Sequence, residues 1–322
     1  MAIQTLLTER FKLRHPVVLA PMALAGGGKL AAAVTAAGGL GLIGGGYGDA
    51  DWLETQFQAA GNQSVGCGFI TWSLAKQPHL LTNVLAHRPA ALMLSFGDPA
   101  PFSPSIAAAG VPLICQCQTM GHVREALAAG AAVIVAQGGE AGGHGMSRGS
   151  LSFVPEVADH LKANAPDVLL LAAGGIADGR GLAASLMLGA DGVLIGTRLW
   201  ASQEALVHGN HHKAIVDSDG DSTLRTTTPD IARRLDWPAG FTARIKRNAF
   251  TAQWHGRESE LLAHADHESA KYSKAFTAGD TDQAGVWFGE AAGLIHTIEP
   301  AQTIIERMVS EAEQCLRRPM LG

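Results

Sequence analysis

Residues 168–197 read VLLLAAGGIADGRGLAASLMLGADGVLIGT, and this stretch decides the fold. Two apolar runs, Val168–Ala172 and Gly192–Ile195, flank an alanine-rich segment, Arg180–Leu188, that has the composition of a helix. Runs that are apolar throughout, instead of alternating, are typical of parallel strands buried on both faces. Glycines follow each run, where a strand turns sharply toward a helix. The stretch therefore predicts one β-α-β unit of a parallel sheet.

The same alternation of short apolar runs and helical segments fills the first 200 residues. We predict strands at Val17–Ala20, Leu40–Ile43, Ser64–Ile70, Ala91–Leu94, Pro112–Gln116, Ala132–Gln137, Val168–Ala172 and Gly192–Ile195. We predict helices at Leu30–Ala37, Asp51–Ala60, His79–His87, Ser103–Ala109, His122–Ala129, Phe153–Ala163 and Arg180–Leu188. Eight strands joined by helices match an α/β fold of the (β/α)8 TIM barrel type, and a doubly wound sheet is the alternative.

The composition changes after strand eight. Residues 203–280 hold 21 charged residues, against 23 in the first 202. We predict a mostly helical insertion here, a subdomain at 203–280, with the barrel formed by 1–202 and 281–322. Its expected helices are Ile231–Leu235, Phe241–Ala249 and Ser259–Ala270. We expect Gln283–Ile295 to be the last barrel helix and Pro300–Arg318 a C-terminal amphipathic helix.

Composition excludes several classes of protein. The chain has 322 residues, is 47% hydrophobic and carries a net charge of −5, so it offers no general field for nucleic acid or anionic lipid. No apolar run reaches the ~20 residues that cross a bilayer, and the first 15 residues lack the apolar region of a signal peptide. Four cysteines do not make a disulfide framework. We expect a cytoplasmic protein without a membrane or nucleic-acid partner.

Glycine is in excess, with 39 residues, of which 30 precede residue 203. Several follow predicted strands seven and eight, as Gly174-Gly175 and Gly196-Thr197. Backbone N–H groups free of side chains, helped by the Thr hydroxyl, are what a phosphate needs at this place in a barrel. The alternative is that these glycines only make tight turns.

His144 lies in a glycine-rich loop after predicted strand six, with glycines at 138, 139, 142, 143 and 145. A histidine titrates near neutral pH and can take a proton from a substrate. We predict that His144 is a catalytic base and that the glycines around it allow close contact with a ligand. The alternative is a histidine that only holds its loop by a backbone hydrogen bond.

Other motifs carry weaker signals. The run Gly39–Gly44 has the spacing of a dinucleotide fingerprint, but it lies on a strand and no acid follows for a ribose. Gly145–Gly149 has the spacing of a serine-hydrolase nucleophile elbow around Ser147, about eight residues after the strand, which is too far. A serine hydrolase stays as the remote alternative.

We expect the cysteines and clustered histidines, which could in principle bind a metal, to have packing or surface roles instead. Cys115 and Cys117 share one face of a strand as small buried residues, and Gln116 faces the other way at the strand end. His208, His211 and His212 have helical spacing and are expected on a solvated face, as are His264 and His267. We predict no metal site.

Taken together, these motifs resemble the nitronate monooxygenase family, also known as 2-nitropropane dioxygenase-like proteins. The matching stretches are Ala20–Ala23, Ala31–Leu42, Gln137–Gly145, Ala173–Gly181, Gly196–Arg198 and Gly279–Trp287. The resemblance implies an FMN-dependent TIM barrel without a metal. It implies that Met22 and Ala23 lie beside the flavin ring and that His144 acts as the base over its reacting face.

For the rest of the cofactor, the resemblance implies contacts along one line of strand ends. It places Gln137 and Gly142 on the ribityl and phosphate side and Gly174, Gly175, Gly196 and Thr197 on the phosphate. We expect Gln116, Gly143 and Leu194 to join this cofactor-binding set.

The implied reaction is the oxidation of alkyl nitronates, or nitroalkanes, by O2 to a carbonyl compound and nitrite. Two relatives share the motifs, and each is an alternative: NAD(P)H-dependent FMN enoyl-ACP reductases and quinone reductases. The partners expected are therefore a small-molecule substrate and O2. The oligomeric state stays open, and a homo-oligomer is one option.

Overall fold

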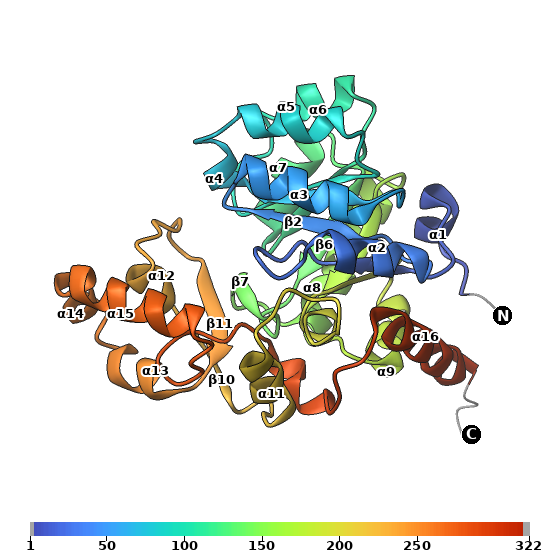
Figure 1. Cartoon of the computed structure of the whole chain (residues 1–322). Helices are drawn as coiled ribbons and strands as arrows, with labels where there is room; N and C mark the ends of the chain where they lie inside the picture. Colours follow the sequence, from blue (N-terminus) through green and yellow to red (C-terminus); the bar gives the residue numbers. More distant parts are fainter. Residues whose placement is uncertain (1–2, 318–322) are drawn as a thin grey trace.

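The computed structural model describes residues 3–317, and its centre is a parallel barrel of eight strands (Figure 1). The strands are β1 (Val17–Leu19), β2 (Leu42–Gly46), β3 (Gly66–Ile70), β4 (Leu92–Ser95), β5 (Leu113–Cys117), β6 (Val133–Gln137), β8 (Leu169–Ala173) and β9 (Gly192–Ile195). They pair in the order β1-β9-β8-β6-β5-β4-β3-β2. A parallel bridge between Val18 and Leu40 closes the circle. The predicted (β/α)8 barrel is confirmed.

Helices cover the outside of the barrel. They are α2 (Gly28–Ala36), α3 (Ala50–Ala60), α4 (Thr71–Leu74), α5 (His79–Ala86), α6 (Ser103–Ala108), α7 (Met120–Ala128), α8 (Ser150–Asn164), α9 (Gly179–Met187) and α16 (Ala301–Arg317). The core has two layers, one inside the barrel and one between strands and helices. Leu7 of the N-terminal helix α1 (Leu6–Phe11) joins the inner layer with Val18 and Leu40. Every barrel strand is buried along its length except at Gln116, as expected for runs apolar on both faces.

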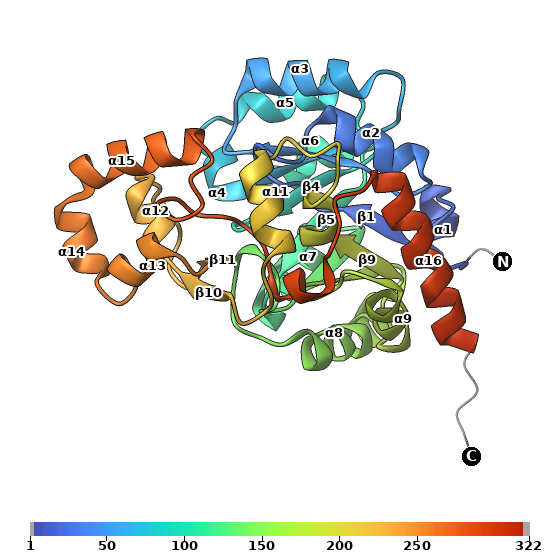
Figure 2. The ribbon, with the colours of Figure 1, turned by 60° about the horizontal axis from the view of Figure 1, so that its bottom comes forward.

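Much of the segment between β9 and α16 projects to one side of the barrel, whereas Trp200, Ala214 and Ala291 of the same segment pack on the barrel (Figures 1 and 2). Its helices are α10 (Thr197–Trp200), α11 (Gly209–Val216), α12 (Thr228–Ala232), α13 (Ala249–Trp254), α14 (Glu258–Ala263), α15 (Ala265–Thr277) and the 3-10 helix η1 (Glu290–Leu294). It also holds strands β10 (Thr223–Thr226) and β11 (Thr242–Lys246). Together with β7 (Gly143–Gly145) of the barrel, they form an antiparallel sheet in the order β10-β11-β7.

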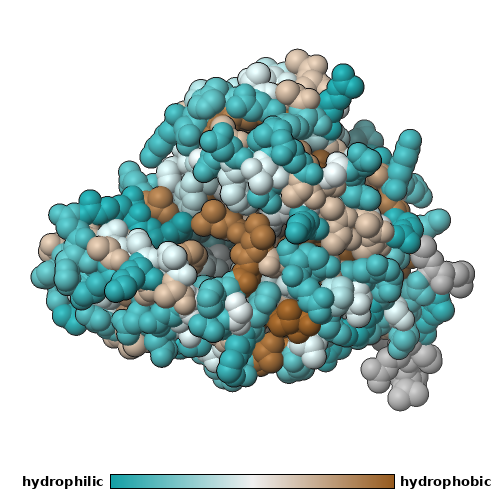
Figure 3. All heavy atoms as spheres, viewed as in Figure 1, coloured by the Kyte–Doolittle hydropathy of each residue, from teal (hydrophilic) through white to brown (hydrophobic). Residues whose placement is uncertain are grey.

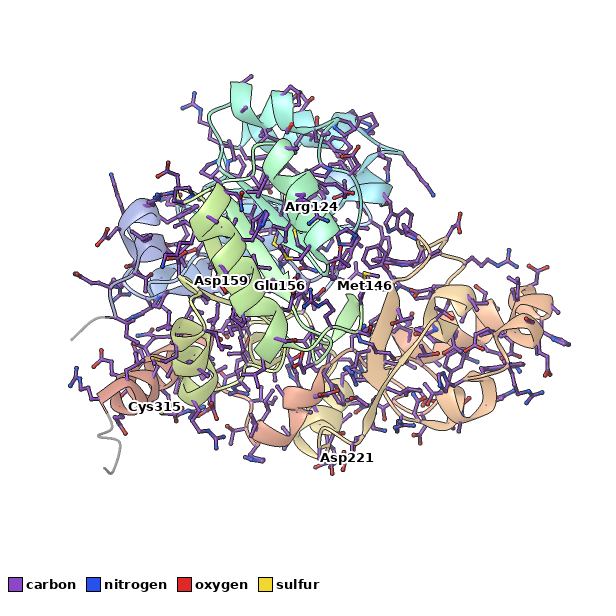
Figure 4. The ribbon with its side chains drawn as sticks, turned by 180° about the vertical axis from the view of Figure 1, so that it is seen from behind. Arg124, Met146, Glu156, Asp159, Asp221 and Cys315 are labelled. Carbon is purple, nitrogen blue, oxygen red and sulfur yellow. The ribbon has the colours of Figure 1, made fainter. Side chains whose placement is uncertain are left out.

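This small sheet joins the projecting segment to the barrel. Seen from behind, Met146 lies just past β7, between the two parts, whereas Glu156 and Asp159 lie along α8 on the barrel (Figure 4). The strand that carries His144 is therefore part of the barrel chain but is paired by the segment that follows strand eight.

The predicted helix Phe241–Ala249 is wrong, because this stretch contains strand β11. Along it Ala243 and Ile245 are buried, and the residues between them are half-buried. This period of two is the strand pattern, and five residues are too short to separate it from a helical pattern in the sequence.

The predicted last barrel helix, Gln283–Ile295, is also wrong. Most of it is irregular chain, and only η1 is helical. The helix α16 packs against α9 and α2 instead, which is the place of the eighth barrel helix. Its buried residues Ile304, Ile305, Met308 and Ala312 follow helical spacing, which confirms the amphipathic prediction up to Arg317. The predicted end at Arg318 lies outside the described residues. Within residues 3–317, no helix has the length and apolarity needed to cross a membrane.

Candidate functional site

A cavity of about 460 Å³ opens at the carboxyl ends of the barrel strands. Figure 3 shows a hollow beside apolar surface where the barrel meets the projecting segment. The exposed leucines Leu24 and Leu206 are part of the cavity lining. The sequence-predicted site residues that line the cavity are Met22, Ala23, Gln116, Gln137, Gly142, Gly143, His144, Gly174, Gly175, Leu194, Gly196 and Thr197. The structure therefore brings the whole predicted set together.

One end of the cavity offers free hydrogen-bond donors. Gly174 and Gly175 have φ angles of +104° and +73°, which side chains rarely tolerate. Within residues 3–317, nothing accepts a hydrogen bond from either backbone N–H. The Thr197 hydroxyl accepts from the N–H of Gly289 at 3.0 Å and so keeps its own proton to donate. Consecutive free N–H groups next to a hydroxyl donor suit a phosphate.

Three glutamines fix the middle of the cavity wall. Nε2 of Gln116 and Nε2 of Gln118 donate to Oε1 of Gln137, at 3.0 and 2.8 Å. Nε2 of Gln137 in turn donates to the backbone oxygen of His144 at 3.0 Å. Both ends of the Gln137 amide thus form hydrogen bonds, and Gln116 keeps its amide oxygen for a ligand.

His144 is 9% exposed and is held from two sides. Its strand, β7, pairs with β11, with His144 opposite Ala243. Its ring is stacked on Trp237, with 3.4 Å between centroids and 6° between planes. Its Nε2 lies 3.0 and 2.9 Å from the two carboxylate oxygens of Asp230, which is 3% exposed. The position and the orientation of this imidazole are therefore both fixed.

This environment sets the protonation of His144. Burial lowers the pKa of its imidazole below the ordinary 6.5, the Asp230 carboxylate raises it, and Arg233 and Arg225 lower it. On balance the pKa of His144 is lowered, so the ring is neutral at pH 7. A carboxylate only accepts hydrogen bonds, hence Nε2 carries the ring proton and Nδ1 carries the lone pair. His144 can therefore accept a proton at Nδ1.

The loop before His144 is anchored by two arginines. Arg225 donates from Nε to the oxygen of Gly139 at 3.1 Å and from Nη2 to that of Ala141 at 3.2 Å. Arg244 donates to the same Gly139 oxygen at 3.0 and 3.1 Å. Burial, with Arg244 nearby, lowers the pKa of Arg225 to about 10, so it stays charged at neutral pH. These bonds fix the glycine-rich loop that the sequence singled out.

Aromatic side chains make the wall around His144. Phe96 lies 6.2 Å from the His144 ring and 5.1 Å from Trp237, and Trp287 lies 5.4 Å from His144, between ring centroids. Tyr47 lies 6.3 Å from Trp237, edge to face. All four line the cavity, so the wall next to His144 is largely aromatic.

Sequence reasoning missed three residues of the projecting segment: Asp230, Arg233 and Trp237. Asp230 lies 86 residues after its partner His144, and nothing local in the sequence marks the pair. The dipeptide Pro229-Asp230 does mark the start of a helix, which is where Asp230 lies, in α12. A search for acids placed at such helix starts would have found it.

The residues of the weaker sequence motifs do not form a second site. Ser147 is exposed and does not line the cavity, and burial raises the pKa of the Cys115 thiol to about 12. His264 and His267 are exposed as expected, but His211 is buried and lines the cavity, so its predicted solvated position is wrong. Residues 3–317 contain no group of three or more metal-ligating side chains.

The chain is similar to proteins of one known family. The family model described as nitronate monooxygenase matches residues 4–63 and 73–311. The chain belongs to the nitronate monooxygenase family. Family members are flavoproteins, and the chain is thus an oxidoreductase acting on a small molecule.

Individual relatives support the assignment to the nitronate monooxygenase family. A nitronate monooxygenase of Neurospora crassa is 31% identical over 95% of this chain and 91% of its own length. One of Metarhizium robertsii is 33% identical over 93% and 91%. Among solved structures, FabK from Thermotoga maritima has a TM-score of 0.85 and 29% identity, covering 98% and 97% of the two chains. Nitroalkane oxidase from Streptomyces ansochromogenes has a TM-score of 0.79 and 26% identity, covering 96% and 98%.

Proposed function

We propose that this protein is an FMN-dependent enzyme that oxidises alkyl nitronates, and the nitroalkanes they come from, with O2 to a carbonyl compound and nitrite. The observation that carries the proposal is the neutral His144, fixed by Asp230 in an apolar cavity at the carboxyl end of the barrel. The likeness to nitronate monooxygenases of similar length and to a nitroalkane oxidase supports it.

The residues present fit FMN. The free N–H groups of Gly174 and Gly175, with Gly196 and the Thr197 hydroxyl, would hold its phosphate. A Cβ at Gly143 would meet nothing within 4 Å, so its backbone leaves open space toward the ribityl side, near Gly142. Met22 and Ala23 would lie beside the ring, with Gln116 and Leu194 completing the contacts. When bound, the flavin supplies the oxidising equivalents and the site of reaction with O2.

We prefer FMN to FAD for a structural reason. The cradle at the strand ends holds donors for one terminal phosphate, and the Gly39–Gly44 run serves packing instead of a second nucleotide. A Cβ at Gly41 would lie 1.9 Å from the backbone oxygen of Ala31, and one at Gly44 would lie 2.2 Å from that of Met22. Gly41 thus lets the chain entering β2 approach α2 closely, and Gly44 lets β2 approach the loop after β1.

The role of the chain's own residues follows from the acidity of the substrate. A neutral nitroalkane is a weak carbon acid, and its α-proton must leave before oxidation. His144 takes this proton at Nδ1, while Asp230 keeps Nε2–H in place and stabilises the charge that develops on the ring. The aromatic wall of Phe96, Trp237 and Trp287 keeps water away from the base. A preformed nitronate has already lost the proton and does not need His144 as a base.

A second candidate is a FabK-like enoyl reductase that takes electrons from NAD(P)H. The observation that favours it is the T. maritima FabK structure, with a TM-score of 0.85 against 0.79 for the nitroalkane oxidase. The same His144 and the same cavity would then donate a proton to a substrate instead of accepting one.

Product analysis on the purified enzyme distinguishes the two. The enzyme is incubated in air with propyl-2-nitronate, and O2 uptake, nitrite and acetone are measured together. In a parallel reaction it receives an enoyl thioester with NADH or NADPH, and loss of the nicotinamide absorbance is followed. The proposal predicts nitrite and acetone in the first reaction and no thioester-dependent oxidation in the second. The reverse pattern would replace it with the reductase.

We also propose that residues 203–280 act as a subdomain that completes the site. Asp230, Arg233 and Trp237 come from this segment, and β11 pairs the strand of His144. Without these residues, His144 would lack its carboxylate partner and the ring on which it stacks.

A further inference from the structure

Arg233 lines the cavity at the end of α12 but has few polar partners. Its Nη1 lies 3.4 Å from the Tyr47 hydroxyl oxygen, which is long for a hydrogen bond. Its guanidinium carbon lies 5.0 Å from the centre of the Tyr47 ring and 5.5 Å from that of Trp287. The two rings orient the guanidinium without neutralising it.

Within residues 3–317, no carboxylate forms a direct ion pair with this guanidinium. Among the ion pairs within residues 3–317, none includes Arg233. Asp230, one turn earlier, gives both oxygens to His144. The neighbouring Arg234 points to the surface, where it pairs with Asp266. A half-buried guanidinium stays charged and is stabilised by an anion, so the cavity holds a positive charge that lacks a directly paired carboxylate.

We infer that Arg233 binds the anionic group of the substrate, and that this site takes planar two-oxygen anions, nitronate or carboxylate, on an apolar body. The guanidinium fork matches two parallel oxygens. The apolar body would lie among Tyr47, Phe96 and Trp287. The inference rests on the proposed function in that a nitronate is such an anion.

The arrangement also links binding to the base. The helix α12 places Asp230, which orients His144, one turn before Arg233, which would hold the anion. The positive charge of Arg233 acts on His144 as well and helps to lower its pKa, so the imidazole stays neutral beside the anion site. Residues of one short helix would thus keep the base neutral and select a substrate that carries a negative charge.

The test compares two ligands of the same shape and different charge. Benzoate and benzamide are titrated by calorimetry into the flavin-loaded enzyme and into three variants: Arg233→Met, Arg233→Lys and Arg234→Met. Arg234 is the matched control, since it is the next residue and pairs at the surface. Flavin content and Tm are measured on each preparation.

We expect the wild type to bind benzoate roughly 10- to 100-fold more tightly than benzamide, the range of a charge-assisted contact. Arg233→Met should bring this ratio to about 1, Arg233→Lys should retain part of it, and Arg234→Met should leave it unchanged. The inference is overturned if the wild type does not bind benzoate or does not prefer it. It is also overturned if Arg233→Met weakens both ligands equally, which is the result of a purely structural role.

The outcome is separable from the proposed function. Should the enzyme fail to turn over nitronates while benzoate preference still depends on Arg233, the nitronate proposal fails and the anion site stands. If nitronates are oxidised but Arg233→Met does not change the preference for benzoate over benzamide, the nitronate proposal stands and the anion site at Arg233 fails.

Discussion

Nε2 of His144 lies 2.9 and 3.0 Å from the two carboxylate oxygens of Asp230, although the residues are 86 positions apart and belong to different parts of the molecule. The histidine is on a strand that leaves the barrel, and the aspartate is in α12 of the segment that follows strand eight. The two parts meet where β11 pairs with β7, with Ala243 opposite His144. The base of the site is thus completed by long-range contacts.

Replacing the members of this pair should separate two substrates. His144→Asn should slow turnover of a neutral nitroalkane by about 10²–10⁴-fold, the usual contribution of a general base, and should affect the preformed nitronate far less. Asp230→Asn should act in the same direction by a smaller factor, because the ring keeps its place on Trp237 but loses its oriented proton. The exposed Asp236→Asn is the control. Both rates and the flavin content are measured in one preparation, and equal losses on both substrates would end the general-base assignment.

The pH dependence of nitroalkane turnover should report the same group. A base must be unprotonated, so kcat/KM should rise as pH rises through the pKa of His144, with a midpoint below the ordinary 6.5 because burial lowers it. Asp230 raises this pKa, hence Asp230→Asn should move the midpoint further down. For the preformed nitronate, kcat/KM should not show this rise with pH, because no proton has to be removed. A wild-type midpoint above 6.5, or an upward shift in the variant, is inconsistent with the account.

The cofactor cradle can be tested by adding a side chain to it. Gly175→Val places a branched side chain at a φ of +73° beside the free N–H groups, so the purified protein should lose its flavin. Gly130→Val is the matched control, since Gly130 has a φ of +78°, is exposed and lies outside the cavity. It should cost about 1–3 kcal/mol of stability but keep the flavin. Heat release and mass analysis should identify FMN, and release of FAD would refute the mononucleotide assignment.

His211 should make the folded state sensitive to acid. Burial, with His208 and His212 nearby, lowers its pKa to about 4, against 6.5 in the unfolded chain. The unfolded state therefore takes up the proton first, so the contribution is fully present above pH 6.5 and is lost as pH falls toward 4. His211→Leu should lose less Tm between pH 7 and 5 than the wild type, whereas the exposed His264→Gln should behave like the wild type. If His211→Leu lost as much Tm between pH 7 and 5 as the wild type, the acid sensitivity would not come from His211.

Local patterns in the sequence predict the barrel well because the strands are apolar along most of their length and several barrel helices, among them α2, α3 and α7, end at alanine. The strand ends then place Gly174, Gly196 and His144 at one edge without further information. The five residues of β11 alternate too briefly to be recognised, and the sequence predicted a helix there. The partnership of His144 with Asp230 depends on how β11 pairs with β7, and no local propensity encodes it.

The most direct test of the proposed reaction is made without oxygen. The flavin-loaded enzyme is mixed anaerobically with propyl-2-nitronate and, in a separate sample, with NADH or NADPH, and the flavin absorbance is followed. We expect the nitronate to bleach the flavin band and the nicotinamide nucleotides to leave it unchanged. Bleaching by NADH or NADPH with no response to the nitronate would contradict the proposed reaction and identify a reductase.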